Sequence, residues 1–506
     1  MIAIKRALCP ILLSSLVPTL AAAHSANKND HPNIIYILAD DMGYGDVSAL
    51  NRDCKVQTRH IDSLVAQGIT FSDAHTSSAV STPSRYSILT GRYNWRSRLQ
   101  SGVGWSYTPA LIEPERMTVA TLLGSAGYRT ACIGKWHLGL GWQYRSDSPK
   151  EVDFTQPLTA CPNDNGFEYS YIMPASLDIP PYVYIENGRI TAPVTDTIDG
   201  HNGYAFWRKG PIAQDFDIAK TLDHFTDKAV EYIRQQAAGN EPFFLYFPLT
   251  APHTPIIPSD RFAGKSGIGP YGDFLLHVDD VVGRVMEAVR EAGIEENTLI
   301  VFTADNGCSP SANYKNLKAH GHNPSYIFRG TKADIYDGGH RVPYIMRYPA
   351  LIAPGSQSNA PVCQTGLMAT CAELLGLRLP DDAGEDSFSQ LSILRGRERA
   401  SDRKHMLIHH SIEGFFAIRQ GQWKLCVCPG SGGWSAPVPG AEAADAPRMQ
   451  LFDMAATPGE PAEANRYAPG QKQSSRMLRE LEKAIQRGRT TPGKPQSNDV
   501  PVVLYK

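Results

Sequence analysis

The sequence predicts an α/β fold in which a mixed, mainly parallel sheet is flanked by helices and followed by a smaller antiparallel subdomain with one helix. Two observations support this fold class. Apolar runs of strand length alternate with helical periodicity through most of the chain, and this alternation is typical of a parallel sheet that is covered on both faces. After about Leu379 the pattern changes to short strand-like runs between Gly- and Pro-rich segments.

The first part of the chain predicts buried strands joined by amphipathic helices. The strands are expected at 33–39 (NIIYILA), 130–133, 243–247 and 299–302, because each run is apolar, short and nearly continuous. Apolar residues with helical spacing predict helices over 215–236 and 274–292.

A breaker at 380–384 predicts the end of this large domain, which we place at 24–384. The remaining chain, 385–506, is expected to form the subdomain, packed against the large domain. Its strands are expected at 406–409, 415–418, 423–427 and 450–453, before a last helix with Leu478, Leu481 and Ile485 on one face.

The N-terminus predicts a signal peptide over residues 1–23. Lys5 and Arg6 precede an apolar run at 7–20, and three alanines form a cleavage site. The run is shorter than the roughly 20 residues of a spanning helix, although an uncleaved anchor remains the alternative. We expect a periplasmic or secreted protein with no membrane span in the mature chain.

Composition excludes some partners and predicts the state of the cysteines. The 49 basic and 51 acidic residues give a net charge of -2, so no basic excess points to nucleic acid. No C-x-x-C pair suggests zinc, and buried free thiols are expected for most of the cysteines beyond the signal peptide. These are Cys54, Cys132, Cys161, Cys308, Cys363, Cys371, Cys426 and Cys428.

Unusual polar clusters follow four of the predicted strands. In open α/β sheets, ligands bind beyond the carboxyl ends of the strands. Each cluster alone has an ordinary explanation as a turn, cap or surface group, but four together predict a site. The clusters are Asp40-Asp41, Gly134-Lys135-Trp136-His137, Pro252-His253-Thr254-Pro255 and Asp305-Asn306-Gly307.

Three carboxylates and one amide in these clusters predict a divalent cation. Oxygen donors of this mixed kind favour calcium, and magnesium stays open. Zinc is disfavoured because no histidine or cysteine adjoins the aspartates in the sequence.

The stretch SAVSTPSRYSILTGRY, residues 78–93, allows two interpretations. Pro83 is expected at the first helical position and Thr82 at the N-cap. Ser81 would then lie just before the helix, beside amide groups that favour anions, with Arg85 in the first turn. The stretch is therefore either a plain helix cap or a nucleophile held beside an anion site.

Together these motifs resemble the type I sulfatases of the alkaline phosphatase superfamily. The resemblance runs from Pro32 to the final helix through NIIYILADDMGYGD, SSAVSTPSRYSILTGRY, GYRTACIGKWHLG, APHTP, FTADNG and FRGTKADIYDGGHRVP. It implies an alkaline-phosphatase-like fold with a smaller C-terminal subdomain.

The resemblance also implies a modified nucleophile and a metal. Ser81 occupies the position that this family converts to formylglycine, and serine there implies maturation by a serine-type radical-SAM enzyme. Calcium would be held by Asp40, Asp41, Asp305 and Asn306, with modified Ser81 completing the shell.

Further roles carry over from the family by position. Arg85 would steady the aldehyde hydrate, and Lys135 and Lys332 would bind sulfate oxygens. His137 would hydrogen-bond the hydrate, and His253 would protonate the leaving alcohol.

The segments GRYNWRSRL, PASLDIPPYVYIENGR and GHNPSYIFRGTKADIYDGGHRVP resemble a branch of the family associated with 6-O-sulfated galactose and N-acetylgalactosamine. Asp178 and His322 are candidate sugar contacts, with loop ordering as the alternative for both. Two other functions stay open: a phosphate mono- or diester hydrolase using unmodified Ser81, and a non-catalytic glycan-binding homologue.

Overall fold

A ten-stranded mixed sheet forms the centre of the protein. The computed structural model describes residues 31–147 and 150–506, so the predicted signal peptide lies outside the described residues. In spatial order the strands are β15 (Ser356–Ser358), β2 (Ile69–Phe71), β14 (Tyr344–Arg347), β13 (Thr298–Ala304), β1 (Asn33–Asp40), β12 (Phe243–Pro252), β4 (Arg129–Lys135), β7 (Tyr169–Met173), β8 (Ile185–Glu186) and β9 (Arg189–Ile190).

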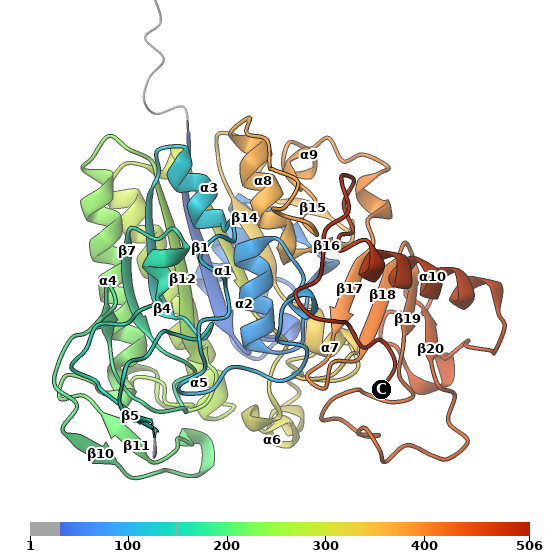
Figure 1. Ribbon diagram of the computed structural model, residues 1–506, viewed down its shortest axis with the longest axis horizontal. Coiled ribbons are helices and arrows are strands. Elements are labelled where there is room, and N and C mark those ends of the chain that lie inside the picture. Colours follow the sequence, from blue (N-terminus) through green and yellow to red (C-terminus); the bar gives the residue numbers. More distant parts are fainter. Residues whose placement is uncertain (1–30, 148–149) are drawn as a thin grey trace, which may run out of the picture.

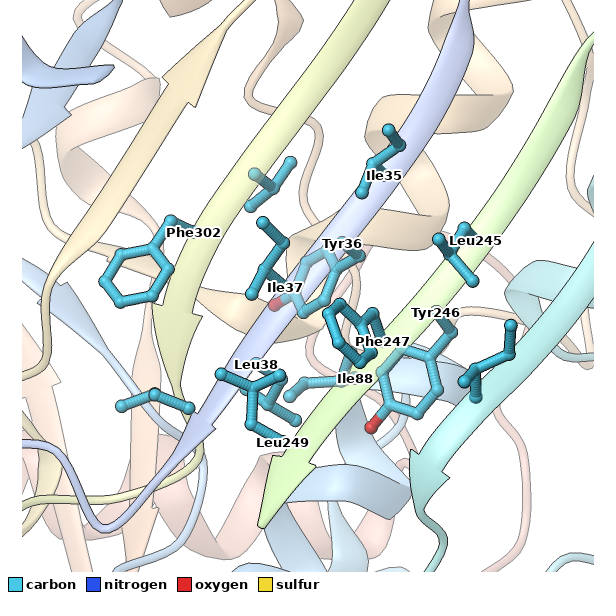
Figure 2. Packing of buried hydrophobic residues seen from close by; sticks show 14 of the residues in the cluster. Ile35, Tyr36, Ile37, Leu38, Ile88, Leu245, Tyr246, Phe247, Leu249 and Phe302 are labelled. Carbon is cyan, nitrogen blue, oxygen red and sulfur yellow. The ribbon is translucent and has the colours of Figure 1, made fainter. Parts of the chain in front are cut away.

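The middle of this sheet is parallel, as predicted. Strands β13, β1, β12, β4 and β7 run side by side in the same direction, whereas β14 and β8 continue the sheet in antiparallel fashion. Because β1 lies between β13 and β12, its whole length is buried. Figure 2 shows Tyr36 of β1, Tyr246 of β12 and Phe302 of β13 in the apolar core.

Helices cover both faces of the sheet (Figure 1). On one face α1 (Arg59–Gln67), α4 (Thr221–Ala237) and α5 (Pro270–Glu291) pack together, and on the other α2 (Ser81–Thr90) packs with α3 (Val119–Ser125) and α8 (Leu367–Leu374). The predicted 215–236 helix begins later, because a 3-10 turn at Ile218–Lys220 precedes α4. Helix α5 begins earlier than predicted, because Pro270 occupies its first turn without needing an N–H partner.

Short elements surround the main sheet. They are the hairpins β5 (Tyr144–Asp147) with β6 (Lys150–Val152) and β10 (Asp196–Ile198) with β11 (Gly210–Ile212), the pair β3 (Ala74–His75) with β16 (Val362–Cys363), and the helices α6 (Tyr314–Ala319), α7 (Asp337–His340) and α9 (Leu391–Leu394). The two hairpins lie together at one end of the molecule (Figure 1).

The C-terminal part contains the predicted small sheet and its helix. The antiparallel strands are β17 (Leu407–His410), β18 (Phe416–Gln420), β19 (Trp423–Cys426) and β20 (Gln450–Asp453), packed against α10 (Lys472–Gln486). Tyr93 and Trp95, which follow α2, are buried in the core of this subdomain. The subdomain is therefore packed against the large domain, as expected from the sequence.

The eight cysteines of the described residues are all free and buried, which confirms the expectation of unpaired thiols. In residues 31–147 and 150–506, no helix is both long and apolar enough to cross a bilayer.

Candidate active site

Adjacent strands bring the predicted acidic residues together. The ends of β1 and β13 are in register at Ala39 and Ala304, and the Asp305 N–H donates to the Ala39 carbonyl oxygen at 3.0 Å. In the opposite direction, the backbone N–H of Asp41, just after β1, donates to Asp305 Oδ1 at 3.2 Å. Asp41 has a φ of 65°, a conformation that non-glycine residues adopt at a cost and that is frequent at functional sites.

Three cations neutralise these carboxylates. Arg85 Nη2 lies 2.7 Å from Asp305 Oδ2. Lys135 Nζ lies 2.6 Å from Asp40 Oδ2, and Lys332 Nζ lies 2.8 Å from Asp41 Oδ2. All six side chains are almost completely inaccessible to solvent, so each charge depends on its partner.

Burial and ion pairing together set the pKa values of the charged groups in this cluster. Burial opposes the charge on Asp40, but Lys135, His253 and Arg85 outweigh it and hold the pKa of Asp40 below its usual value. Burial also lowers the pKa of Lys135. For Lys332 burial acts in the same direction, but the Asp41 and Asp40 carboxylates prevail and raise its pKa.

Ser81 is the first residue of α2, because the helix begins two residues earlier than the sequence predicted. Val80 is the N-cap and no side chain caps the helix, so the expected N-cap role of Thr82 is wrong. Thr82 Oγ1 instead accepts a hydrogen bond from the Gly104 N–H at 3.0 Å. Pro83 still costs no hydrogen bond, because the first four N–H groups of a helix have no partner within it.

The hydroxyl of Ser81 belongs to the same cluster. Lys135 Nζ lies 3.5 Å from Ser81 Oγ and donates to Ser176 Oγ at 3.0 Å. Ser176 follows β7 and was missed, because nothing in its local sequence distinguishes it from an ordinary loop serine.

His137 is fixed as a neutral ring. Its Nε2 lies 2.9 Å from the carbonyl oxygen of Gly104, an acceptor, so Nε2 carries the proton. Its Nδ1 is buried without a hydrogen-bond partner among the described residues. Burial, Lys135 and Arg85 hold the pKa of His137 well below its usual value. Nδ1 is therefore free to accept a hydrogen bond from a hydroxyl.

His253 lies beside the carboxylates. Its Nδ1 lies 2.6 Å from the Thr254 carbonyl oxygen, and its Nε2 lies 3.6 Å from Asp41 Oδ2. A histidine therefore does adjoin the aspartates in space, which removes the premise on which zinc was disfavoured. Asp40, Asp41 and His253 have ligand atoms close enough to share a metal ion.

Two buried oxygens of the cluster have no hydrogen-bond partner among the described residues. They are Asp40 Oδ1 and Asn306 Oδ1, and Asn306 Nδ2 meanwhile donates to Asp41 Oδ1 at 2.7 Å. Asp40 Oδ1 has a cationic neighbour in Arg85 Nη2 at 3.5 Å. Buried oxygens rarely lack a hydrogen-bond partner, so both oxygens suit a bound cation. The residues present therefore suit a metal with oxygen ligands.

The two candidate sugar contacts have different positions. Asp178 lies at the site, with Oδ1 3.9 Å from His253 Nδ1. His322 is fully buried, accepts from the Lys55 N–H at 3.3 Å and lies 2.8 Å from Asp46 Oδ1. His322 therefore orders its loop, and its expected sugar contact is wrong because both ring nitrogens are already engaged.

Comparison with known proteins identifies the family. The sulfatase family model matches residues 32–377. The chain belongs to the sulfatase family. It is 34% identical to an N-acetylgalactosamine-6-O-sulfatase of Bacteroides thetaiotaomicron over 92% of this chain and 94% of the relative. It is 30% identical to human arylsulfatase A, covering 81% of this chain and 77% of that protein.

A solved structure confirms the fold of this sulfatase. It comes from work on glycosaminoglycan metabolism in Bacteroides thetaiotaomicron, has a TM-score of 0.77 and 31% identity, and covers 90% of this chain and 99% of its own. The protein is thus a sulfuric ester hydrolase with the predicted fold, and its relatives favour this function over the phosphate-ester and non-catalytic alternatives.

Proposed function

We propose that this sulfatase removes sulfate from glycans, with 6-O-sulfated galactose or N-acetylgalactosamine as the sugar. The observation that carries the proposal is the 34% identity to a bacterial N-acetylgalactosamine-6-O-sulfatase along nearly the full length of both chains. A rat N-acetylgalactosamine-6-sulfatase is 27% identical over 96% of this chain. A periplasmic or secreted location, following the predicted signal peptide, would give the enzyme access to such polymers.

We propose calcium as the metal, held by Asp40, Asp41, Asp305 and Asn306 together with modified Ser81. The oxygens of Asp40 and Asn306 that lack hydrogen-bond partners among the described residues support this set, and calcium accepts carboxylate and amide oxygens. When bound, the ion would polarise the sulfate group and lower the pKa of the attacking hydroxyl.

The charge balance of the site suits an anionic substrate. Three carboxylates already face three cations, so a divalent ion would add a surplus of two positive charges. A sulfate ester carries negative charge into this surplus, and the attraction is strong because the site is shielded from water. Lys135 and Lys332 would contact its oxygens as point charges.

Ser81 is the proposed position of formylglycine, made by a serine-type radical-SAM maturation enzyme. The hydrated aldehyde would supply one hydroxyl for attack on sulfur and a second for release of the sulfate. Arg85, one turn along α2 from residue 81, would steady the hydrate, and His137 Nδ1 would accept a hydrogen bond from it.

We propose that His253 protonates the departing alcohol. The Thr254 carbonyl only accepts, so the 2.6 Å contact assigns a proton to Nδ1 of His253. Nε2 is then the atom that faces the carboxylates, 3.6 Å from Asp41 Oδ2, and it is the atom that would take up and deliver the catalytic proton.

The test is desulfation of defined sugars by the matured enzyme. Mass spectrometry of the peptide containing residue 81 would establish the aldehyde, and ion chromatography would measure released sulfate. We expect turnover of 6-O-sulfated galactose or N-acetylgalactosamine and little turnover of isomers sulfated elsewhere. Preferential turnover of another isomer would overturn the sugar assignment, and full activity from unmodified Ser81 would overturn the nucleophile assignment.

A further inference from the structure

A loop at residues 101–108 carries an exposed tryptophan directly from the active site. Gly104 is tied to the site twice: its N–H donates to Thr82 Oγ1 at 3.0 Å, and its carbonyl accepts from His137 Nε2 at 2.9 Å. The next residue, Trp105, is 53% exposed. Its position is therefore fixed relative to the active site, although its ring faces solvent.

Arg208 connects this tryptophan to the catalytic groups. It lies between β10 and β11, and its guanidinium carbon is 5.0 Å from the ring centroids of both Trp105 and Phe206. Its Nη1 pairs with the Asp178 carboxylate, whose other oxygen lies 3.9 Å from His253 Nδ1. A continuous row of side chains thus runs from His253 to Trp105.

Arg208 is held in place by its backbone, and part of its guanidinium group remains available for hydrogen bonding. The backbone N–H of Arg208 donates to the backbone carbonyl of Asp178 at 3.1 Å, and the backbone carbonyl of Arg208 accepts from Tyr182 Oη at 2.6 Å. Within the described residues the guanidinium donates through Nη1, and 39% of the side chain is exposed. Its other N–H groups therefore remain available to a ligand in a preorganised position.

We propose that Trp105 and Arg208 form a sugar-binding platform that positions the pyranose ring carrying the sulfate ester. A pyranose has an apolar C–H face, which packs on an exposed indole, and hydroxyl groups, which accept hydrogen bonds from a guanidinium. This inference rests on the proposed function, because the ligand is the sugar half of the proposed substrate. The platform lies on the side of His253, the group that would protonate the sugar oxygen.

Binding to protein with unmodified Ser81 tests the platform without turnover. With calcium present, calorimetry would measure Kd for 6-O-sulfated galactose and, separately, for inorganic sulfate. Trp105→Ala is expected to weaken sugar binding about tenfold, and Arg208→Met by a similar factor, while sulfate Kd stays within about twofold. Trp105→Phe should restore most of the affinity, because it keeps an aromatic face.

Tyr505→Ala is the matched control. Tyr505 is 56% exposed and its hydroxyl donates to Glu482 of α10, so its loss removes a similar exposed aromatic surface elsewhere. Sugar Kd in this variant should match the wild type.

Kinetics of the matured enzyme give the second readout. Trp105→Ala should raise KM for the sulfated sugar about tenfold with kcat nearly unchanged, and leave hydrolysis of methyl sulfate, which has no ring, within about twofold. Unchanged sugar Kd and KM would overturn the platform, as would equal losses for the sugar and for inorganic sulfate. Wild-type protein that binds the sugar through Trp105 but never releases sulfate would instead overturn the proposed function.

Discussion

Two buried charged clusters in this protein have similar composition but different bonding. The strand-end cluster holds Asp40, Asp41 and Asp305 with their three cations, and the second cluster, at the junction of the large domain and the small sheet, centres on Asp337. Each contains an acid and histidine set close enough to hold a metal ion: Asp40, Asp41 and His253 in the first, and His75, Asp337 and His409 in the second.

The carboxylate of the junction cluster is saturated. Asp337 Oδ1 lies 2.7 Å from Lys424 Nζ, and Asp337 Oδ2 lies 2.6 Å from Arg341 Nη2. The ring of His409 is stacked on that of His75, with centroids 4.8 Å apart, and lies tilted against that of His340, with centroids 4.5 Å apart. Because Asp337 already pairs with Lys424 and Arg341, its charge is compensated by residues from two parts of the chain.

The two clusters differ in which buried atoms lack hydrogen-bond partners among the described residues. At the strand ends they are oxygens of Asp40 and Asn306, whereas in the junction cluster they include both ring nitrogens of His409 and Glu460 Oε1, which lies 2.7 Å from Lys424 Nζ. Burial and charge are common to both clusters, so neither property alone identifies a binding site. The strand-end cluster is distinguished by its position at the carboxyl ends of parallel strands, where ligands bind in open α/β sheets. The comparison predicts that changes at the strand ends alter chemistry, whereas changes at the junction alter stability.

The largest expected effect is on catalysis at the strand ends. Ser81→Ala in the matured background should lower kcat/KM by about 10⁴-fold or more, because the nucleophile is lost. Its free energy of unfolding should stay within about 0.5 kcal/mol, since within the described part of the chain the Ser81 hydroxyl makes one long hydrogen bond, at 3.5 Å from Lys135 Nζ. Sulfate release measures kcat/KM, and urea unfolding measures the free energy of unfolding. A loss of stability as large as the loss of activity would contradict a catalytic role for the strand-end cluster.

Lys424→Met should have the opposite effect. Lys424 Nζ lies 2.7 Å from both Asp337 and Glu460. Asp337 keeps Arg341 as a partner, but Glu460 loses its cation, and an uncompensated buried charge costs about 3–5 kcal/mol. Activity per folded molecule should be retained. Lys209→Met is the control, because its partner Asp199 is exposed and such pairs contribute about 0–1 kcal/mol. Equal urea midpoints for the two variants would contradict a structural role for the junction cluster.

His253→Ala separates proton transfer from the rest of the chemistry. Hydrolysis of alkyl sugar sulfates should fall about 10²- to 10³-fold, whereas aryl sulfates, whose leaving groups need no proton, should lose much less. Parallel kcat measurements with both ester types decide the matter. Identical losses would assign the proton to another group.

Calcium should stabilise the strand-end cluster. At a concentration of 100 times Kd, the ion should add about 2.7 kcal/mol to the free energy of unfolding, measured as a rise in Tm that a chelator reverses. Asn306→Ala removes an unpaired oxygen and should reduce this rise. An equal rise in Asn306→Ala would place the ion elsewhere.

The smallest expected effect concerns acid sensitivity of the junction. Burial, His340, His75 and Lys424 hold the pKa of His409 well below its usual value. In the unfolded chain His409 binds a proton near pH 6.5, whereas in the folded chain it stays neutral at that pH. The free energy of unfolding therefore falls as the pH drops below that value. His409→Leu should reduce the slope of stability between pH 6 and 4 by up to about 1.4 kcal/mol per pH unit; an unchanged slope would show that His409 does not titrate on unfolding.

Much of the site could be predicted because it depends on local patterns. Apolar runs followed by Asp40-Asp41 or Asp305-Asn306 fix both a strand and the polar groups at its end, and parallel neighbours carry those ends to one edge. The start of α2 was less predictable. The competing hydrogen bond from Gly104 to Thr82 comes from a distant loop and leaves no trace in residues 78–93.

The sequence by itself determined the parallel sheet, the small C-terminal sheet and the residues at the strand ends, because periodicity and chain order act over short distances. Only the tertiary structure decided which lysine faces which aspartate and that Trp105 meets Arg208. It also gathered His75, Asp337 and Lys424 into a junction. These contacts join residues that lie far apart in the sequence and share no local pattern, so their geometry forms only when the whole chain is packed.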